Sequence, residues 1–227
     1  MLSKCFIRIA GLLIVFVLIS GCAAFRKNLN GQYLPQNYEP NDSKPVKVLF
    51  VFSHYHQIKG LDTVQKLSSK YQILKDFNAI FSDARYEIQN LGTYDMFTDD
   101  PDDVNSPKRR LLCDSLKHSN DFTIHTRILK SNSFAQYVIS SMFSTASLTL
   151  IPTPYQNNYE FETRVYNQDQ RLIATYKRDS SVVKWVQPLM ILLYPFYPFE
   201  RMQEEVYLLA LHDIYKQINQ ERILTKE

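Results

Sequence analysis

The stretch VKVLFVFS at residues 46–53 carries a single charge in an otherwise almost continuous apolar run. Such a run is typical of a β-strand that is buried on both faces of a sheet. A second strand is predicted over residues 121–129 (DFTIHTRIL), in which Phe122, Ile124 and Ile128 alternate with more polar side chains. Together the two stretches predict a sheet at the centre of the fold.

Helical patterns flank these strands. Apolar residues at spacings of three and four predict a helix over residues 61–83. Shorter helices are expected over 107–117, where Pro107 suits a first turn, and over 132–147. Glutamates near its start and basic residues near its end predict a last helix over 199–220.

Three further stretches complete the predicted sheet. Residues 85–91 alternate in polarity, and residues 159–166 and 171–177 alternate on either side of a turn-like NQDQ sequence, which indicates a hairpin. The predicted order is β-α-β-α-β-α-β-β-β-α. This order favours a mixed α/β fold, with a layered mixed sheet and flanking helices.

The start of the chain has the features of an export signal. Lys4 and Arg8 precede an uncharged apolar run at residues 9–19, which is too short for a comfortable membrane span. The run ends in Ile19-Ser20-Gly21-Cys22, which resembles the lipobox of bacterial prolipoproteins. This resemblance implies that a signal peptidase removes residues 1–21 and that Cys22 carries a covalent lipid. We expect no other cofactor.

Composition sets the remaining limits. Residues 22–45 are polar and contain Pro and Gly, so we predict a flexible tether there and one globular domain over 46–227. The formal charge of +3 provides no basic field for nucleic acid. With Cys22 lipidated and the signal removed, Cys113 is the last thiol, which we expect to be a small buried hydrophobic residue.

Parts of the domain are similar to the periplasmic domains of CsgG-, TolB- and LptE-type envelope proteins. The similar segments are FNAIFSDARYEIQNL, SLKHSNDFTIHTRIL and the hairpin YEFETRVYNQDQRLIATY, within residues 46–176. Residues 134–154 and those after 182 depart from the pattern. The resemblance implies an assembly or binding module without catalytic residues.

These observations predict a non-enzymatic envelope lipoprotein. Ala23 follows the lipidated cysteine where an inner-membrane lipoprotein would carry Asp, which implies the outer membrane and its periplasmic face. The expected partners are the membrane, through the lipid, and another envelope protein.

Two groups of polar residues suggest alternatives. His54 and His56 follow the first strand on one face, with Asp62 nearby, so a metal-dependent hydrolase is the alternative to histidines in a polar loop. Four aspartates could bind calcium or form a solvated acidic turn: Asp99, Asp100, Asp102 and Asp103. Cys113, Asp114 and His118 are not spaced as a catalytic dyad.

Two apolar stretches stand out. Residues 131–159 carry no charge, and the stretch from Val182 to Phe199 is apolar but interrupted by prolines. Each could form a membrane-contacting or partner-contacting surface, or part of the core. The contact candidates in the second stretch are Trp185, Leu189, Leu192, Tyr194, Phe196 and Tyr197.

Overall fold

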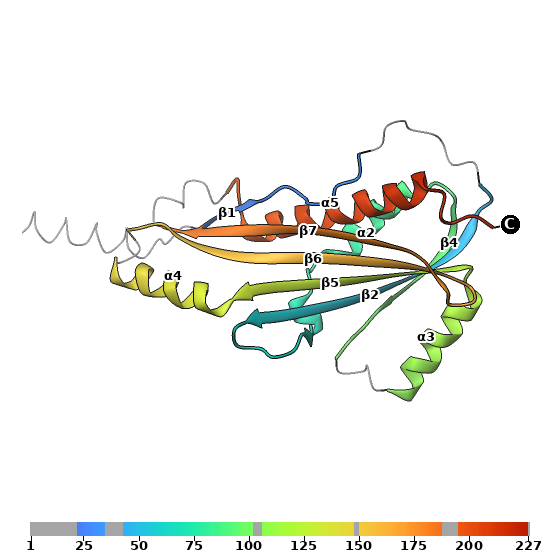
Figure 1. Cartoon of the computed structure of the whole chain (residues 1–227), viewed down its shortest axis with the longest axis horizontal. Coiled ribbons are helices and arrows are strands. Elements are labelled where there is room, and N and C mark those ends of the chain that lie inside the picture. The colour runs from blue at the N-terminus through green and yellow to red at the C-terminus, as the bar shows by residue number, and fades with distance from the viewer. Residues whose placement is uncertain (1–21, 35–42, 102–105, 148–149, 188–194, 227) are drawn as a thin grey trace, which may run out of the picture.

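The structure, a computed structural model, describes residues 22–34, 43–101, 106–147, 150–187 and 195–226 (Figure 1). Its centre is a seven-stranded mixed sheet with the path β1-β7-β6-β5-β2-β3, in which β4 also pairs with β2. Strands β4, β2 and β5 are parallel, and the remaining pairs are antiparallel. The strands are β1 Cys22–Arg26, β2 Val46–Lys59, β3 Lys66–Leu67, β4 Leu91–Thr98, β5 Phe122–Ser133, β6 Thr153–Asn167 and β7 Leu172–Val186.

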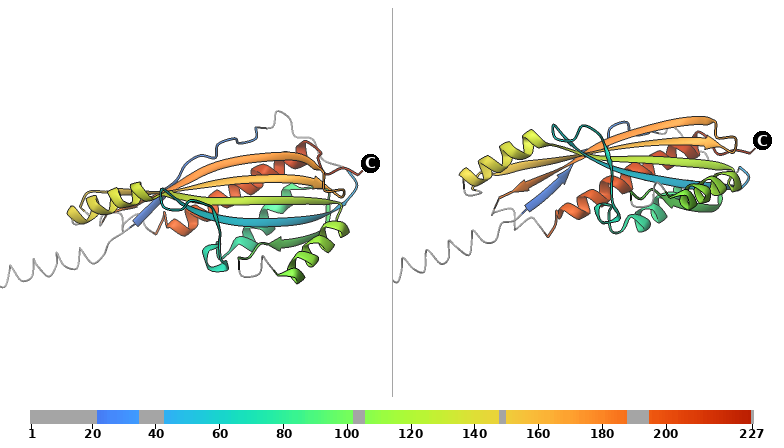
Figure 2. Two further views of the ribbon diagram at one scale, coloured as in Figure 1. Left: turned by 60° about the horizontal axis from the view of Figure 1, so that its bottom comes forward. Right: turned by 90° about the horizontal axis from the view of Figure 1, so that it is seen from below.

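Two helices cover one face of the sheet. These are α2 (Phe77–Ala84) and the long α5 (Phe199–Gln220), which lie side by side beneath the strands in Figure 2. The core between these layers is rich in aromatic side chains. Phe50 of β2, for example, packs edge-on against Phe81 and Tyr215, with ring centroids 4.9 and 5.6 Å apart. Burial of these large rings, together with aliphatic side chains of the same cluster, holds the layers together.

Helix α3 (Pro107–Ser119) covers part of the other face. Cys113 and Leu116 pack there against Leu49, Val51 and Phe97. Charged side chains pair across the strands of the remaining face: Arg127–Glu162 and Lys177–Glu162 join neighbouring strands, and Lys59–Glu160 joins β2 to β6 across β5. Helix α4 (Phe134–Ala146) follows β5 and extends beyond the sheet at the opposite end from α3 (Figure 1).

The mixed α/β class and its layered sheet with flanking helices are confirmed. The predicted hairpin, the strand over 121–129 and the helices over 107–117, 132–147 and 199–220 are present. The first strand is longer than predicted, because β2 pairs with β5 as far as Lys59. His54 and His56 therefore lie within a strand instead of the loop that follows it.

The predicted helix over 61–83 is wrong over its first two thirds, up to residue 76. Gly60 adopts φ +91°, and Asp62 accepts a hydrogen bond from the Ile58 backbone N–H, so the chain turns back and forms β3. Leu61 and Val64, which the helical stripe would have buried, are 59% and 63% exposed. An α-helix begins only at Phe77.

The predicted strand over 85–91 is also wrong. A short 3₁₀ helix occupies Arg85–Glu87, and the strand begins at Leu91, where it pairs in parallel with β2. Alternation of polarity alone could not place this boundary, because the extent of β4 is set by its pairing with β2 and not by its own sequence pattern. In the described part of the chain, β1 and β3 are added and two strands rather than three precede the last helix, so the observed element order is β-β-β-α-β-α-β-α-β-β-α.

The segment predicted as a tether makes defined contacts where it is described. Residues Cys22–Arg26 form β1 antiparallel to β7, so Cys22 stands opposite Val186. Farther along, the Asn30 backbone N–H donates to Asp179 O at 2.8 Å. The first residues after the cysteine therefore lie along the edge of the sheet.

A buried ion pair fastens α5 to β7. Arg178 Nε lies 2.5 Å from Asp213 Oδ2, and the two side chains are 5% and 9% exposed. The Tyr33 backbone N–H donates one bifurcated hydrogen bond to both carboxylate oxygens of Asp213, and Arg178 donates to Gln217 and to the Lys177 carbonyl. This extra bonding offsets part of the free energy needed to remove both charges from water.

We expect Asp213→Ala to lower the free energy of unfolding by about 3–5 kcal/mol, because it leaves the Arg178 guanidinium buried without its counter-charge. The matched control is Arg201→Ala, which breaks an exposed pair with Glu205 on the same helix and should change stability by less than about 1 kcal/mol. Denaturant titration of the purified protein measures both. Equal effects of the two variants would contradict the structural role assigned to the pair.

Candidate functional site

One candidate site is a pocket of about 440 Å³ at the end of β2, next to α5. The alternation of β2 directs His54 and His56 toward the helix-covered face, where Phe50 and Phe52 also point. His54 is 3% exposed and packs edge-on against Phe77, with ring centroids 4.8 Å apart. The prediction that the two histidines share one face agrees with this placement.

His54 is distinctive because neither ring nitrogen has a hydrogen-bond partner among the described residues. Burial lowers the pKa of His54 from its usual value to about 4, so the ring is neutral at neutral pH. A neutral imidazole offers one N–H donor and one nitrogen acceptor. In a buried setting, these two unmet groups favour a polar ligand or an ordered water.

Other polar groups line the same pocket. Burial also lowers the pKa of Lys130, whose ammonium lies near the rings of Tyr159 and Phe199 at 6.0 and 5.8 Å. Gln203 donates to the Tyr159 hydroxyl, and Glu200 completes the lining on the side of α5. The sequence did not identify Lys130, which reaches this site because β5 pairs in register with β2.

This arrangement does not assemble the predicted metal site. Asp62 accepts hydrogen bonds from the Ile58 backbone N–H and from Lys66, which holds the Asp62 pKa below its usual range. His56 contacts Ser68 Oγ at 3.3 Å through Nδ1. In the part of the chain that the structure describes, no group of three His, Cys, Asp or Glu residues is placed to hold a metal ion.

A second polar cluster lies on the opposite face, beside α3. Ser53 Oγ is 2.8 Å from His125 Nε2 and donates to the Asp99 carboxylate, so the serine stands between the acid and the histidine. A nucleophilic triad requires the histidine to receive the serine proton. Here the Ser53 hydroxyl donates its hydrogen bond to the Asp99 carboxylate instead, and Ser53 is only 1% exposed. The cluster fits a structural bridge between β2, β4 and β5.

The four aspartates do not share one described site. Asp99 bonds Ser53, whereas Asp100 is buried and pairs with Lys70 Nζ at 3.2 Å. Asp102 and Asp103 lie outside the described residues. Two of the four carboxylates predicted to bind calcium therefore bond to other side chains.

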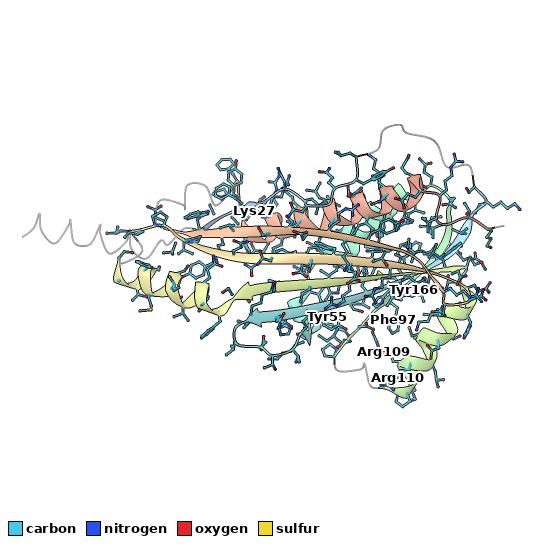
Figure 3. All side chains as sticks on the ribbon, in the orientation of Figure 1. Lys27, Tyr55, Phe97, Arg109, Arg110 and Tyr166 are labelled. Atoms are coloured by element: carbon cyan, nitrogen blue, oxygen red, sulfur yellow. The ribbon has the colours of Figure 1, made fainter. Side chains whose placement is uncertain are left out.

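The thiol of Cys113 lines a shallow pocket with Phe97, Arg109 and Lys117. Arg109 stacks over the Phe97 ring at 4.5 Å, and Figure 3 shows both beside Arg110 where α3 meets β4. Burial raises the Cys113 pKa, which keeps the thiol protonated and weakens it as a nucleophile. The predicted packing role is the better description, although the side chain is half-buried rather than fully buried.

The contact candidates near the end of β7 are partly described. Trp185 lies in β7 opposite Ala23, while Phe196 and Tyr197 are 66% and 40% exposed. Tyr197 packs against the ring of Phe25, with centroids 5.1 Å apart. Leu189, Leu192 and Tyr194 lie outside the described residues. Among the described helices, none is both long and apolar enough to span a bilayer.

Neither a protein-family model nor a curated protein sequence matches the chain. Among solved structures, it is similar to a leucine-to-methionine variant of the PelC dodecamer from Paraburkholderia phytofirmans, with 8% identity, a TM-score of 0.28, and coverage of 87% of this chain and 96% of that chain. A PelC dodecamer in a second crystal form gives 7% identity, a TM-score of 0.29, and coverage of 86% and 96%. Likeness at this level assigns neither family nor function.

The buried imidazole predicts an acid-sensitive fold. The unfolded chain binds a proton at His54 near pH 6.5, but the folded chain does so only near pH 4. Stability from this group is therefore complete above pH 6.5 and falls by about 3 kcal/mol as the pH drops to 4. We expect His54→Phe to flatten the stability curve between these pH values.

The matched control is His118→Gln, because His118 is exposed on α3. Urea titrations of the three proteins from pH 7.5 to 4 measure the effect. Parallel curves for the native protein and for His54→Phe would contradict the burial of a neutral His54.

Proposed function

We propose that this chain is a bacterial lipoprotein, attached through lipid on Cys22 to the periplasmic face of the outer membrane, and that its domain acts as a binding or assembly module rather than as an enzyme. The observation that carries the proposal is the sequence Ile19-Ser20-Gly21-Cys22 after a basic start and a short apolar run. Ala23 at the next position supports the outer membrane as the destination.

The start of the domain is compatible with cleavage before Cys22. Strand β1 begins at Cys22 and pairs with β7 from its first residue, opposite Val186. Removal of residues 1–21 would leave every pairing of this strand in place. Maturation would therefore produce a domain whose first ordered residue is also its lipid attachment point.

A groove on the sheet supports the binding role. Its volume is about 680 Å³, and it is lined by side chains of both charges, among them Lys27, Arg127, Glu162 and Lys177. Figure 3 shows Lys27 near the edge of the sheet beside β7. The Arg164 guanidinium holds the Glu162 pKa below its usual range, so the carboxylate stays ionised. Such a balanced, ionised surface suits recognition of another protein by charge complementarity.

The anchor is tested with Cys22→Ala. We expect this variant to lack lipid and to accumulate as uncleaved precursor, because the modified thiol is the substrate for processing. The matched control is Cys113→Ala, which removes the other cysteine of the domain and should mature normally. Metabolic labelling with a fatty acid and intact-mass measurement follow both. Normal maturation of Cys22→Ala would overturn the proposal.

The binding role is tested by site-specific photocrosslinking in cells. A crosslinker at Lys177, whose side chain is 73% exposed in the groove, should capture one discrete envelope protein. The control position is Arg201, which is exposed on α5, a helix of the opposite face. The same products from both positions, or none from Lys177, would contradict a partner surface at the groove.

A further inference from the structure

Helix α4 buries polar side chains and exposes apolar ones, the reverse of the usual pattern. Its buried residues are Ser140 and Ser144, and the Ser140 hydroxyl donates to the Pro154 carbonyl at 2.8 Å. Ile139, Met142 and Phe143 are 54%, 67% and 59% exposed. Positions 139, 142 and 143 share one helical face by their three- and four-residue spacing. The helix thus turns serines toward the protein and large apolar side chains away from it.

Other exposed apolar side chains lie on α4 and beyond it. Phe134 and Tyr137, in the first turn of the helix, are 41% and 56% exposed, and Leu150 and Ile151 beyond the helix are 71% and 55% exposed. From residue 131 to residue 159 the sequence has no Asp, Glu, Lys or Arg. Several exposed apolar side chains on an uncharged segment mark a place where an apolar partner makes contact.

The surface lies at the end of the sheet where the proposed anchor begins. Trp185 of β7 pairs with Ala23 on one side and with Pro154 on the other, and Pro154 is the residue that Ser140 of α4 bonds. Strand neighbours are about 5 Å apart, so β6 lies only about 10 Å from β1. Figure 1 shows β1 and α4 at this same end, with α3 at the other.

We propose that α4 sits in the lipid–water interface of the bilayer that holds the acyl chains of Cys22. This inference rests on the proposed lipoprotein function, because the acyl chains are what bring the bilayer to this end. Aromatic and aliphatic side chains without charge are the residues that an interfacial helix inserts. The partner is a lipid surface, and a protein or a second copy of the chain is the competing occupant.

A second contact changes what the anchor does. Acyl chains on one residue hold the domain near the membrane but allow it to rotate. Attachment at both Cys22 and α4 defines which end of the sheet faces the bilayer. The charged groove, with Lys177 and Glu162 on the long face of the sheet, then keeps a constant orientation toward the periplasm.

The test places one fluorescent probe at each end of the domain. In a Cys113→Ser background, the full lipidated chain carries Met142→Cys on α4 or Leu112→Cys on α3, both exposed apolar positions in the native protein. Each thiol is labelled with an environment-sensitive dye, and the protein is reconstituted in phosphatidylethanolamine–phosphatidylglycerol vesicles with brominated acyl chains. We expect a blue shift and loss of emission for the probe at 142, and neither for the probe at 112.

The outcomes separate the two proposals. Fatty-acid labelling of Cys22 reports the anchor by itself. A lipidated chain in which the probes at 142 and 112 respond equally overturns the seating of α4 and leaves the anchor intact. A blue shift at 142 without bromine quenching also overturns it, because the probe is then covered by protein instead of lipid. An unlipidated chain overturns the anchor and, with it, this inference.

Discussion

The buried contact between Arg178 of β7 and Asp213 of α5 fixes the arrangement of the helix layer on the sheet. A buried ion pair contributes little net stability, because two charges must leave water to form it. It does restrict geometry, since any sliding of α5 along β7 would leave a charge without its partner in an apolar layer. The aromatic core supplies the favourable free energy, and the ion pair selects one position for the helix among those that the core would tolerate.

The same carboxylate also directs the start of the chain. The Tyr33 backbone N–H reaches Asp213, and the preceding residues bond to β7 at Asp179 and Ser181. These contacts align the segment antiparallel to β7 and bring Cys22 to the end of that strand. Asp213 therefore holds the segment at Tyr33, and the pairing of β1 with β7 places Cys22, the proposed lipid attachment point.

The sequence predicted elements that carry their own signal and missed those that depend on partners. Strand β5 and helix α5 have strong periodicity, and both are present. The stripe after Leu61 was equally periodic, but Gly60 and the Asp62 turn override it locally. Strand β1 is only five residues long, too short to show a periodic signal, and it forms because β7 offers it a free edge.

Candidate sites were predictable to a similar degree. Alternation placed His54 and His56 on one face, but spacing could not reveal that the His54 nitrogens lack partners or that Lys130 joins them from β5. Ser53, Asp99 and His125 come together only because three parallel strands align, and no local sequence pattern predicts this contact.

Helix α4 shows why periodicity leaves function open. An apolar stripe identifies a helix with one side in contact with an apolar phase, but it does not say which phase. In α2, Phe77 and Phe81 are buried, so the apolar stripe packs against the protein core. In α4, the side that packs against the protein carries serines, and the stripe formed by Ile139, Met142 and Phe143 faces outward. A domain held at a membrane by the proposed lipid on Cys22 would have a bilayer within reach of this stripe, so the proposed anchor supplies the apolar phase that the outward stripe of α4 lacks in the protein.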